Sequence, residues 1–284
     1  VTAPDKPAGR GCKIKCSDVK NFAVENNLPL LQPSNLKDYE FIQSLKSLNP
    51  DIFIVVAFRM LPEEVWKIPK YGTVNLHASL LPDYRGAAPI NHAIINGETK
   101  TGLTTFFIEK EIDTGNIILQ EECDIEDSDN AGSLHDKLML MGGNLVIKTL
   151  KAISEGLVNP VPQNKLIKEK IRPAPKINKE FCKIDFSLTC IELYDFIRGL
   201  SPYPAAWCNI NEIADSVKIF KSTCSTEQHS YSIGKLLTDN KSFIKVAVSN
   251  GFIIIEELQL SGKKRLSVKE FLNGYNFSTE AFCS

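Results

Sequence analysis

The hydrophobic pattern of residues 18–160 alternates between segments with helical spacing and short apolar runs. The helical spacing predicts three helices, near 19–23, 36–45 and 133–153, and Gly156 follows the last one as a stop signal. The apolar runs predict strands at 52–57, 73–77 and 103–107. The run at 52–57 is apolar throughout, as expected of a strand that is buried on both faces of a parallel sheet. Helices that alternate with strands indicate an α/β domain with a mainly parallel sheet.

The pattern changes after residue 160. The segment from Pro160 to Lys179 is rich in Pro and Lys and has no clear period, so we interpret it as an interdomain linker. A helix at 189–199 follows, and then short β-rich runs at 217–220, 235–238, 243–248 and 252–258. Residues 249–251, Ser-Asn-Gly, predict a tight hairpin turn between the last two runs. We therefore expect a compact β-barrel in this half.

Length and composition are those of a globular protein with two domains. The chain has 284 residues, of which 43% are hydrophobic, so it can build sizeable cores. The formal net charge is −1, but basic side chains concentrate in residues 1–20 and 163–180. These segments either meet a polyanion or are solvated loops.

The cysteines argue against a zinc protein, and the longest apolar run argues against a transmembrane helix. The eight cysteines are scattered, and the one close pair, Cys12 and Cys16, has no Cys or His pair with ligand spacing to complete a zinc site. We therefore expect reduced thiols in a cytoplasmic protein, with no zinc site. The longest apolar run, 52–58, is too short to span a bilayer.

Polar residues stand where two of the predicted strands end. Asn75 and His77 are two positions apart on a strand, so both side chains project from the same face. Asp113 lies in the turn EIDTG that follows the strand 103–107, at the sheet edge where ligands of α/β proteins bind. The amide and the imidazolium can donate to a developing oxyanion, and the carboxylate can orient the imidazole, which together suit acyl transfer. From the residues alone, a second interpretation also stands, in which His77 is a satisfied core residue and Asp113 only forms a turn.

Motifs along nearly the whole chain resemble those of the methionyl-tRNA formyltransferase family. In the first half these motifs are VTAPDKPAGRG, PDIFIVVAFRMLP, NLHASLLPDYRGAAPINHAIINGE, TGLTTFF and EIDTG. In the second half they are KINKEFCKIDFS, IRGLSPYPAAW and GKKRLSVKEFLNG. The resemblance implies a monomeric cytoplasmic enzyme that uses no metal. Its reaction would transfer the formyl group of 10-formyltetrahydrofolate to the α-amino group of methionyl initiator tRNA.

The resemblance also implies a domain plan. A Rossmann-like formyltransferase domain with a mainly parallel sheet would occupy residues 1–162, followed by a basic linker at 163–180. A C-terminal OB-like β-barrel domain that binds tRNA would occupy residues 181–284. The family opens with a strand, a Gly-Thr-Pro turn and a helix that are absent here, so we expect the first domain to lack its first strand and helix.

Residue roles follow from the same motifs. The resemblance implies that Asn75, His77 and Asp113 are catalytic. It implies folate contacts from Ser79, Leu80, Leu81, Pro82, Phe58 and Met60. It implies tRNA contacts from Arg10, Lys13 and Lys15. The pair Phe58-Arg59 stands where the family has an aromatic-Gly pair, so the resemblance does not determine which residues line the pterin pocket here. We assign the other histidines to structure or surface, namely His92, His135 and His229.

Two alternatives to this function remain. Another enzyme that uses 10-formyltetrahydrofolate, either a hydrolase or a sugar-amine formyltransferase, would need the same catalytic groups. The basic loop PAGRG and the segment GKKRLSVKEFLNG favour a tRNA substrate over these. A non-catalytic tRNA-binding fragment is the second alternative, and the intact Asn75, His77 and Asp113 favour an enzyme.

Overall fold

The chain forms two compact units, Val1–Asn75 and Leu76–Ser284. The computed structural model describes residues 1–8, 13–57, 59–167 and 170–284, and only the backbone of residues 7–8 and 13–15. Within these residues, every helix is too short or too polar to cross a membrane.

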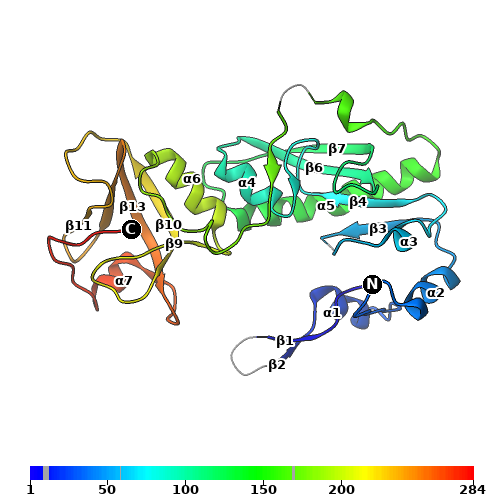
Figure 1. Cartoon of the computed structure of the whole chain (residues 1–284), viewed down its shortest axis with the longest axis horizontal. Helices are drawn as coiled ribbons and strands as arrows, with labels where there is room; N and C mark the ends of the chain where they lie inside the picture. The colour runs from blue at the N-terminus through cyan, green and yellow to red at the C-terminus, as the bar shows by residue number, and fades with distance from the viewer. Residues whose placement is uncertain (9–12, 58, 168–169) are drawn as a thin grey trace. The chain divides into compact units, whose positions relative to one another are not determined.

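The first unit combines an N-terminal hairpin with three helices and two neighbouring strands (Figure 1). Its elements in order are β1 (Lys6–Ala8), β2 (Lys13–Lys15), α1 (Asp18–Glu25), α2 (Tyr39–Ser47), β3 (Phe53–Val56), α3 (Glu63–Trp66) and the start of β4 (Thr73–His77). The carboxylate of Asp38 caps α2 by accepting from the backbone N–H groups of Glu40 and Phe41. The buried face of α2 then joins a small core that consists of Leu36, Phe41, Ile42, Leu45 and Val65.

Two expectations for the first unit are wrong. The strand β3 is not buried on both faces, because Phe53, Ile54 and Val55 are half-buried and Val56 is exposed. The helix α1 forms where the sequence predicts it, but Val19 and Phe22 on its predicted apolar face are each 61% exposed. An apolar pattern reports the capacity of a face to be buried, and the neighbouring segments decide whether it is covered.

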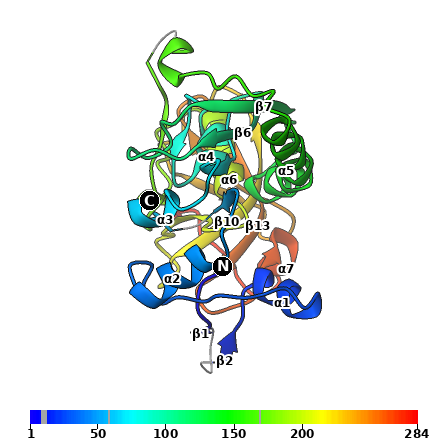
Figure 2. The same cartoon turned by 90° about the vertical axis from the view of Figure 1, so that its right-hand side faces the viewer.

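In the second unit a sheet and one long helix share a core. The strand β4 ends in this unit and is followed in the sheet by β6 (Lys100–Phe107) and β7 (Ile117–Asp124). The helix α5 (Ala131–Ser154) lies along β6 and β7 in both views (Figure 1, Figure 2). Its capping residue, Asn130, accepts from the N–H groups of Gly132 and Ser133. Leu134, Leu138 and Leu145 are buried in the core between helix and sheet.

The strand β7, which pairs antiparallel with β6, is not predicted by the hydrophobic pattern. The sheet is therefore mixed at this edge, where the prediction was a mainly parallel one. The strand β7 carries Gln120, Glu121 and Glu122 in its middle, and this polar run hides the period of a half-buried strand.

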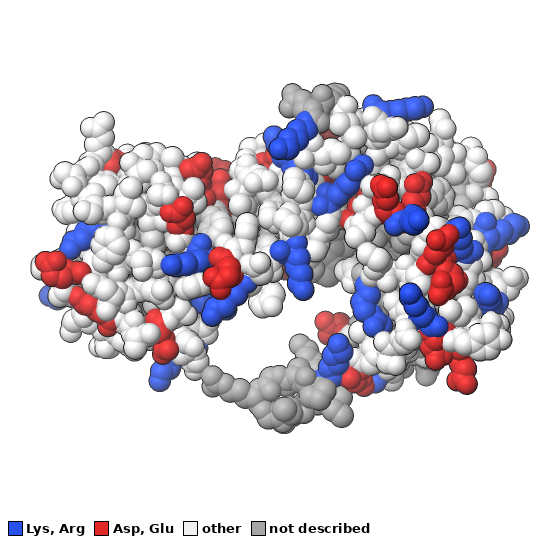
Figure 3. Space-filling view, viewed as in Figure 1, with Lys and Arg blue, Asp and Glu red and all other residues white. Residues whose placement is uncertain are grey.

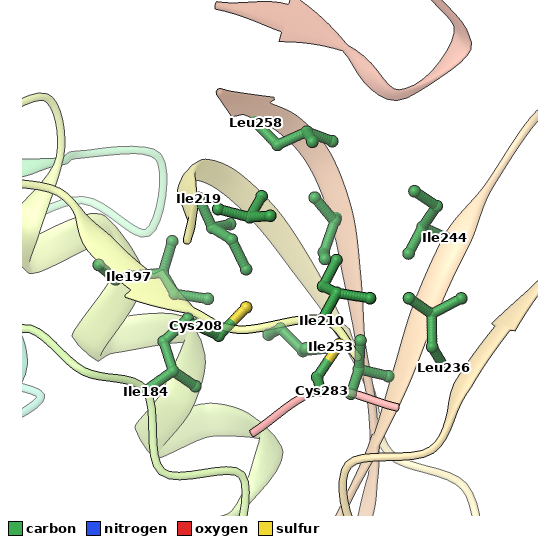
Figure 4. Packing of buried hydrophobic residues seen from close by; sticks show 14 of the residues in the cluster. Ile184, Ile197, Cys208, Ile210, Ile219, Leu236, Ile244, Ile253, Leu258 and Cys283 are labelled. Atoms are coloured by element: carbon green, nitrogen blue, oxygen red, sulfur yellow. The ribbon is translucent and has the colours of Figure 1, made fainter. Parts of the chain in front are cut away.

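The C-terminal part is an antiparallel sheet with helices packed on it. Its strands are β9 (Ala206–Cys208), β10 (Val217–Ser225), β11 (Leu236–Thr238), β12 (Ile244–Val248), β13 (Gly251–Leu260) and β14 (Leu266–Ser267). The order is β11-β12-β13-β10-β9, with β14 paired to β13. The helices α6 (Cys190–Leu200) and α7 (Val268–Leu272) cover a core that is seen from close by in Figure 4. The predicted hairpin is confirmed, since Val248 pairs with Gly251.

No closed barrel is present in the described residues of this part. The last residues of the chain hydrogen bond near both edges of the sheet, because Ser284 N donates to Asn209 O at 2.9 Å and Cys283 N donates to Gly234 O at 2.8 Å. These are isolated bridges rather than a strand that closes the sheet. The prediction of a barrel is therefore not confirmed, while the series of short antiparallel strands is.

The segment interpreted as a linker contains regular structure. It holds a 3-10 turn, Gln163–Lys165, and the short strand β8 (Pro173–Ala174). The strand β8 pairs in parallel with β5 (Arg85–Gly86), just before the helix α4 (Pro89–Ile95). This pairing joins the segment to the loop that follows the predicted catalytic strand.

One cysteine pair contradicts the expectation that all thiols are reduced. Cys190, at the start of α6, and Cys224, in β10, form a disulfide with Cα atoms 5.6 Å apart. The two residues are 34 positions apart, so no spacing motif connects them, and the packing of α6 on β10 brings them together. Cys16, Cys123, Cys182, Cys208 and Cys283 are free.

Candidate active site

His77 ends the strand β4 and is 7% exposed. Its Nε2 lies 2.9 Å from the carbonyl oxygen of Tyr84. A carbonyl oxygen only accepts, so Nε2 carries the proton and donates it. The ring also packs edge-on against Phe106, with centroids 6.4 Å apart and an interplanar angle of 79°. These two contacts fix the direction in which Nδ1 points.

Asp113 lies in the loop after β6 and points towards His77. Its backbone adopts φ +55°, a left-handed conformation that Asp tolerates better than most residues. One carboxylate oxygen, Oδ2, accepts from the backbone N–H of Gly86 at 2.9 Å and lies 3.9 Å from His77 Nδ1. This last distance is too long for a hydrogen bond, so Gly86 positions the carboxylate and the pair interacts by charge when the imidazole is protonated. The side chains are 8% and 12% exposed, so water screens the interaction only weakly.

Asn75 lies two residues before His77 on β4 and is half-buried. It is the last residue of the first unit, whereas His77 and Asp113 belong to the second. The alternation of side chains along the strand places Asn75 and His77 on one side of β4. Its participation with the other two residues stays a prediction.

The loop Ser79–Pro82 is held from within the protein. Thr104 Oγ1 accepts from Leu81 N at 3.1 Å and donates to Ser79 O at 2.7 Å, and Gln120 Nε2 donates to Leu81 O at 2.9 Å. Ser79 is fully buried, and Leu81 packs with Phe106 and Ile117. The peptide bond between Leu81 and Pro82 is cis. The hydrogen bonds to Thr104 and Gln120 make the loop a rigid turn beside His77, and they give the backbone groups of Leu81 protein partners.

The remaining predicted contacts are spread over the first unit. Met60 is described and is 74% exposed. Phe58 and Arg10 lie outside the described residues, and for Lys13 and Lys15 in β2 only the backbone is described. Their roles stay predictions. On the face drawn in Figure 3, Lys and Arg side chains are interspersed with Asp and Glu.

The other histidines have contacts that suit structural or surface positions. His92 is buried, its Nε2 donates to Pro175 O at 3.0 Å, and burial lowers the pKa of its imidazole below the usual 6.5. His229 Nε2 lies 2.9 Å from Val248 O, and the side chain of His135 is 60% exposed. Among the described residues, no cluster of three or more His, Cys, Asp or Glu side chains could hold a metal ion.

Sequence reasoning missed three residues that surround Asp113. Gly86 supplies the N–H that holds the carboxylate, and its φ of +126° is a conformation that favours glycine. Arg85 and the buried Gln163 are joined by hydrogen bonds and connect to the backbone of Asp113. The glycine inside the loop RGAAP was a local signal for a special backbone position. No spacing rule points to Gln163, because it lies 50 residues from Asp113.

Comparisons with known proteins agree over both halves of the chain. The family model described as formyl transferase matches residues 1–150, and the formyl transferase C-terminal domain matches residues 176–276. The chain is 57% identical to a methionyl-tRNA formyltransferase of Flavobacterium johnsoniae over 283 residues, which cover 99% of this chain and 89% of the relative. It belongs to the methionyl-tRNA formyltransferase family. A relative of the same name from Bacteroides fragilis is 55% identical over 286 residues, which cover 99% of this chain and 88% of that protein.

A solved member of the wider formyltransferase group shares the fold. WlaRD, described as a sugar 3N-formyl transferase in the presence of dTDP and 5-N-formyl-THF, superposes with a TM-score of 0.63 at 23% identity. The superposition covers 87% of this chain and 82% of that one. The family models and the curated relatives confirm the family inferred from the motifs, and the chain is a formyltransferase.

Proposed function

We propose that this protein transfers the formyl group of 10-formyltetrahydrofolate to the α-amino group of methionyl initiator tRNA. The observation that carries the proposal is the 57% identity, over 99% of the chain, to a protein named methionyl-tRNA formyltransferase. The alternatives among folate-using enzymes have less support, since the sugar formyltransferase WlaRD is only 23% identical.

The reaction forms one C–N bond and breaks another. The uncharged α-amine of methionine attacks the formyl carbon, and the carbonyl oxygen becomes an oxyanion in a tetrahedral intermediate. The intermediate collapses when the bond between the formyl carbon and the folate nitrogen breaks. The proton lost by the amine balances the proton gained by the folate nitrogen. The protein has to stabilise the oxyanion and guide this proton.

His77 is suited to act on the oxyanion through Nδ1. Its Nε2 is bonded to Tyr84 O, whereas Nδ1 lies at 3.9 Å from Asp113, beyond hydrogen-bond distance. When protonated, Nδ1 is a cationic donor, and the nearby carboxylate of Asp113 stabilises that charge. We assign Asn75 as a second donor to the oxyanion and Asp113 as the residue that steers the proton, directly or through water.

The substrate contacts in this proposal come from the family motifs. The folate contacts are Ser79, Leu80, Leu81, Pro82, Phe58 and Met60. The tRNA contacts are Arg10, Lys13 and Lys15. The rigid hydrogen bonding of Leu81 to Thr104 supports a preformed folate loop. We further propose that the C-terminal sheet is the OB-like part that binds tRNA. We also propose that the enzyme acts as a monomer in the cytoplasm, the compartment in which its tRNA substrate is aminoacylated.

An assay of formyl transfer with three acceptors tests the function. 10-Formyltetrahydrofolate is supplied with initiator Met-tRNA, with an amino-sugar nucleotide, or with water alone. Transfer to Met-tRNA is the expected result. Formylation of the amino sugar alone would instead indicate a sugar-amine formyltransferase, and hydrolysis of the donor without transfer would indicate a 10-formyltetrahydrofolate hydrolase.

Variants of the catalytic groups test the mechanism. His77→Ala, and likewise Asn75→Ala, should lower kcat by roughly 10²–10⁴-fold, because a donor to the oxyanion is lost. His135→Ala is a matched control, since the side chain of His135 is 60% exposed, and it should keep wild-type turnover. Wild-type kcat in His77→Ala would remove His77 from the mechanism.

A substitution in the basic loop separates the two substrates. Arg10→Ala should raise the KM for Met-tRNA and flatten its salt dependence, because a phosphate contact is lost. The KM for formylfolate should not change. A KM for tRNA equal to that of the wild type would leave Arg10 as a solvated residue.

A further inference from the structure

Gln163 is a buried polar residue whose amide is fully engaged. It is 2% exposed and starts the 3-10 turn Gln163–Lys165. Its Oε1 accepts from Arg85 twice, from Nε at 2.9 Å and from Nη2 at 2.6 Å. Its Nε2 donates to Asp113 O at 2.9 Å and to Gly115 O at 2.8 Å. Because guanidinium groups only donate, Arg85 sets which end of the amide faces Asp113.

The two carbonyl groups that Gln163 binds lie at either end of the turn 113–115. Asp113 adopts a left-handed φ of +55°, and Gly115 is buried against β6, where a Cβ would lie 1.7 Å from Phe107 O. The direction of the Asp113 side chain depends on this backbone conformation. Gln163 holds the turn at both ends and so fixes that direction.

Arg85 connects the same turn to the loop beside His77. Its neighbour Gly86 donates its N–H to Asp113 Oδ2 at 2.9 Å, and its other neighbour, Tyr84, accepts from His77 Nε2. The residues 84–86 therefore contact His77 and the carboxylate of Asp113 directly, and the backbone of Asp113 through Gln163. A displacement of Arg85 or Gln163 would change the position of Asp113 relative to His77.

We propose that Gln163 is a positioning residue for formyl transfer, that it sets the Asp113 carboxylate beside His77, and that Arg85 holds its amide for this task. The proposal rests on the proposed function for the role of Asp113. An amide side chain can accept twice from Arg85 through its oxygen and donate twice to backbone carbonyls through its nitrogen. In Gln163→Glu, a carboxylate oxygen would replace Nε2 and would face the carbonyl oxygens of Asp113 and Gly115, which it cannot bond.

Four variants measure the effect on turnover. Gln163→Met keeps the size of the side chain and Gln163→Glu keeps the acceptor for Arg85, and each should lower kcat by about 10- to 100-fold. The KM for formylfolate and for Met-tRNA should stay within about twofold, because neither substrate contacts Gln163 in this scheme. Arg85→Lys keeps one donor and should retain more turnover than Arg85→Met.

Two controls separate positioning from loss of stability. Asn91 Nδ2 donates to Gly199 O at 2.7 Å, so Asn91→Leu also loses a bond from an amide to a carbonyl and should lower the unfolding temperature without lowering kcat. Gln120→Met removes donors to Leu81 O and Thr104 Oγ1, and should raise the KM for formylfolate rather than lower kcat. A loss of kcat in Asn91→Leu equal to that in Gln163→Met would assign the effect to stability and overturn the proposal.

A readout without turnover distinguishes this proposal from the proposed function. The amide proton of Gly86 is bonded to a carboxylate, which shifts its NMR resonance downfield. Arg85→Met and Gln163→Met should move this resonance upfield, and Asn91→Leu should not. An unmoved Gly86 resonance in folded Arg85→Met would refute the positioning role, whatever acceptor the enzyme formylates. If the Gly86 resonance moves in Arg85→Met and Gln163→Met but the wild type does not formylate Met-tRNA, the proposed function is refuted and the positioning of Asp113 is supported.

Discussion

Gly86→Ala introduces a side chain at a place where the backbone leaves no room. A Cβ on Gly86 would lie 2.3 Å from Ala174 O and 2.9 Å from Ala174 C, whereas ordinary contacts begin near 3.4 Å. The clashing atoms belong to the backbone of β8, which pairs with β5, so no rotation of a side chain relieves the contact. The two strands must move apart by about 1 Å, the difference between 2.3 and 3.4 Å.

A displacement of this size would reach Asp113, one of the proposed catalytic residues. We expect it to strain or break the hydrogen bond of 2.9 Å from Gly86 N to Asp113 Oδ2, because Gly86 is itself the displaced residue. Misplacement of a catalytic group by about 1 Å lowers turnover by about 10²-fold, equivalent to about 2.7 kcal/mol of activation free energy. The φ of +126° adds a cost of about 1–3 kcal/mol to the free energy of folding, because a residue with a side chain is strained in this region.

The measurement is kcat for formylation of initiator Met-tRNA, together with the unfolding temperature. Gly143→Ala is the matched control, since a Cβ on Gly143 in α5 meets no atom within 4 Å. This control should keep full turnover and gain up to about 1 kcal/mol of stability from helix propensity. Wild-type kcat in folded Gly86→Ala would show that the contact between Gly86 and Asp113 does not position the carboxylate for the reaction.

Three further substitutions probe the folate loop, a buried histidine and a buried carboxylate. Thr104→Val removes a donor to Ser79 O and an acceptor for Leu81 N, and should raise the KM for formylfolate about tenfold with a smaller effect on kcat. An unchanged KM would show that the loop Ser79–Pro82 does not contribute to folate binding. Burial lowers the pKa of His92 below 6.5, so the folded state binds fewer protons than the unfolded state and loses stability as pH falls through and below that value. His92→Gln, which can still donate to Pro175 O, should reduce the fall in unfolding temperature between about pH 7.5 and about pH 5.5, and an equal fall in both proteins would contradict this. Asp129 is 4% exposed and accepts from Lys137 Nζ at 2.7 Å and from Glu126 N at 2.9 Å. Asp129→Ala should therefore lower the free energy of unfolding in urea by about 2 kcal/mol and leave kcat unchanged. An unchanged free energy of unfolding would show that the ion pair of Asp129 with Lys137 does not stabilise the fold.

Much of the local structure and the family follow from the sequence by itself. The apolar spacing of 133–153 predicts α5, and the run 73–77 predicts β4 at its observed bounds. The order of the motifs around NLHASLLPDYRGAAP identifies the formyltransferase family, which the comparisons confirm. The sequence also places His77 at the end of one strand and Asp113 in the turn after another, and in the structure His77 Nδ1 and Asp113 Oδ2 lie 3.9 Å apart. Their catalytic roles stay a prediction.

The tertiary structure alone decided how that pair is held. The Tyr84 carbonyl, rather than Asp113, bonds the imidazole, and Gly86 bonds the carboxylate. The 3-10 turn and β8 lie in a segment whose composition indicates a linker, and Gln163 reaches Asp113 across 50 residues of chain. Hydrophobic periodicity reports which face of one element can be buried, and it carries no information about which distant segment will satisfy a buried amide or carboxylate. That choice is made only when the elements pack and each buried polar group must find its partner.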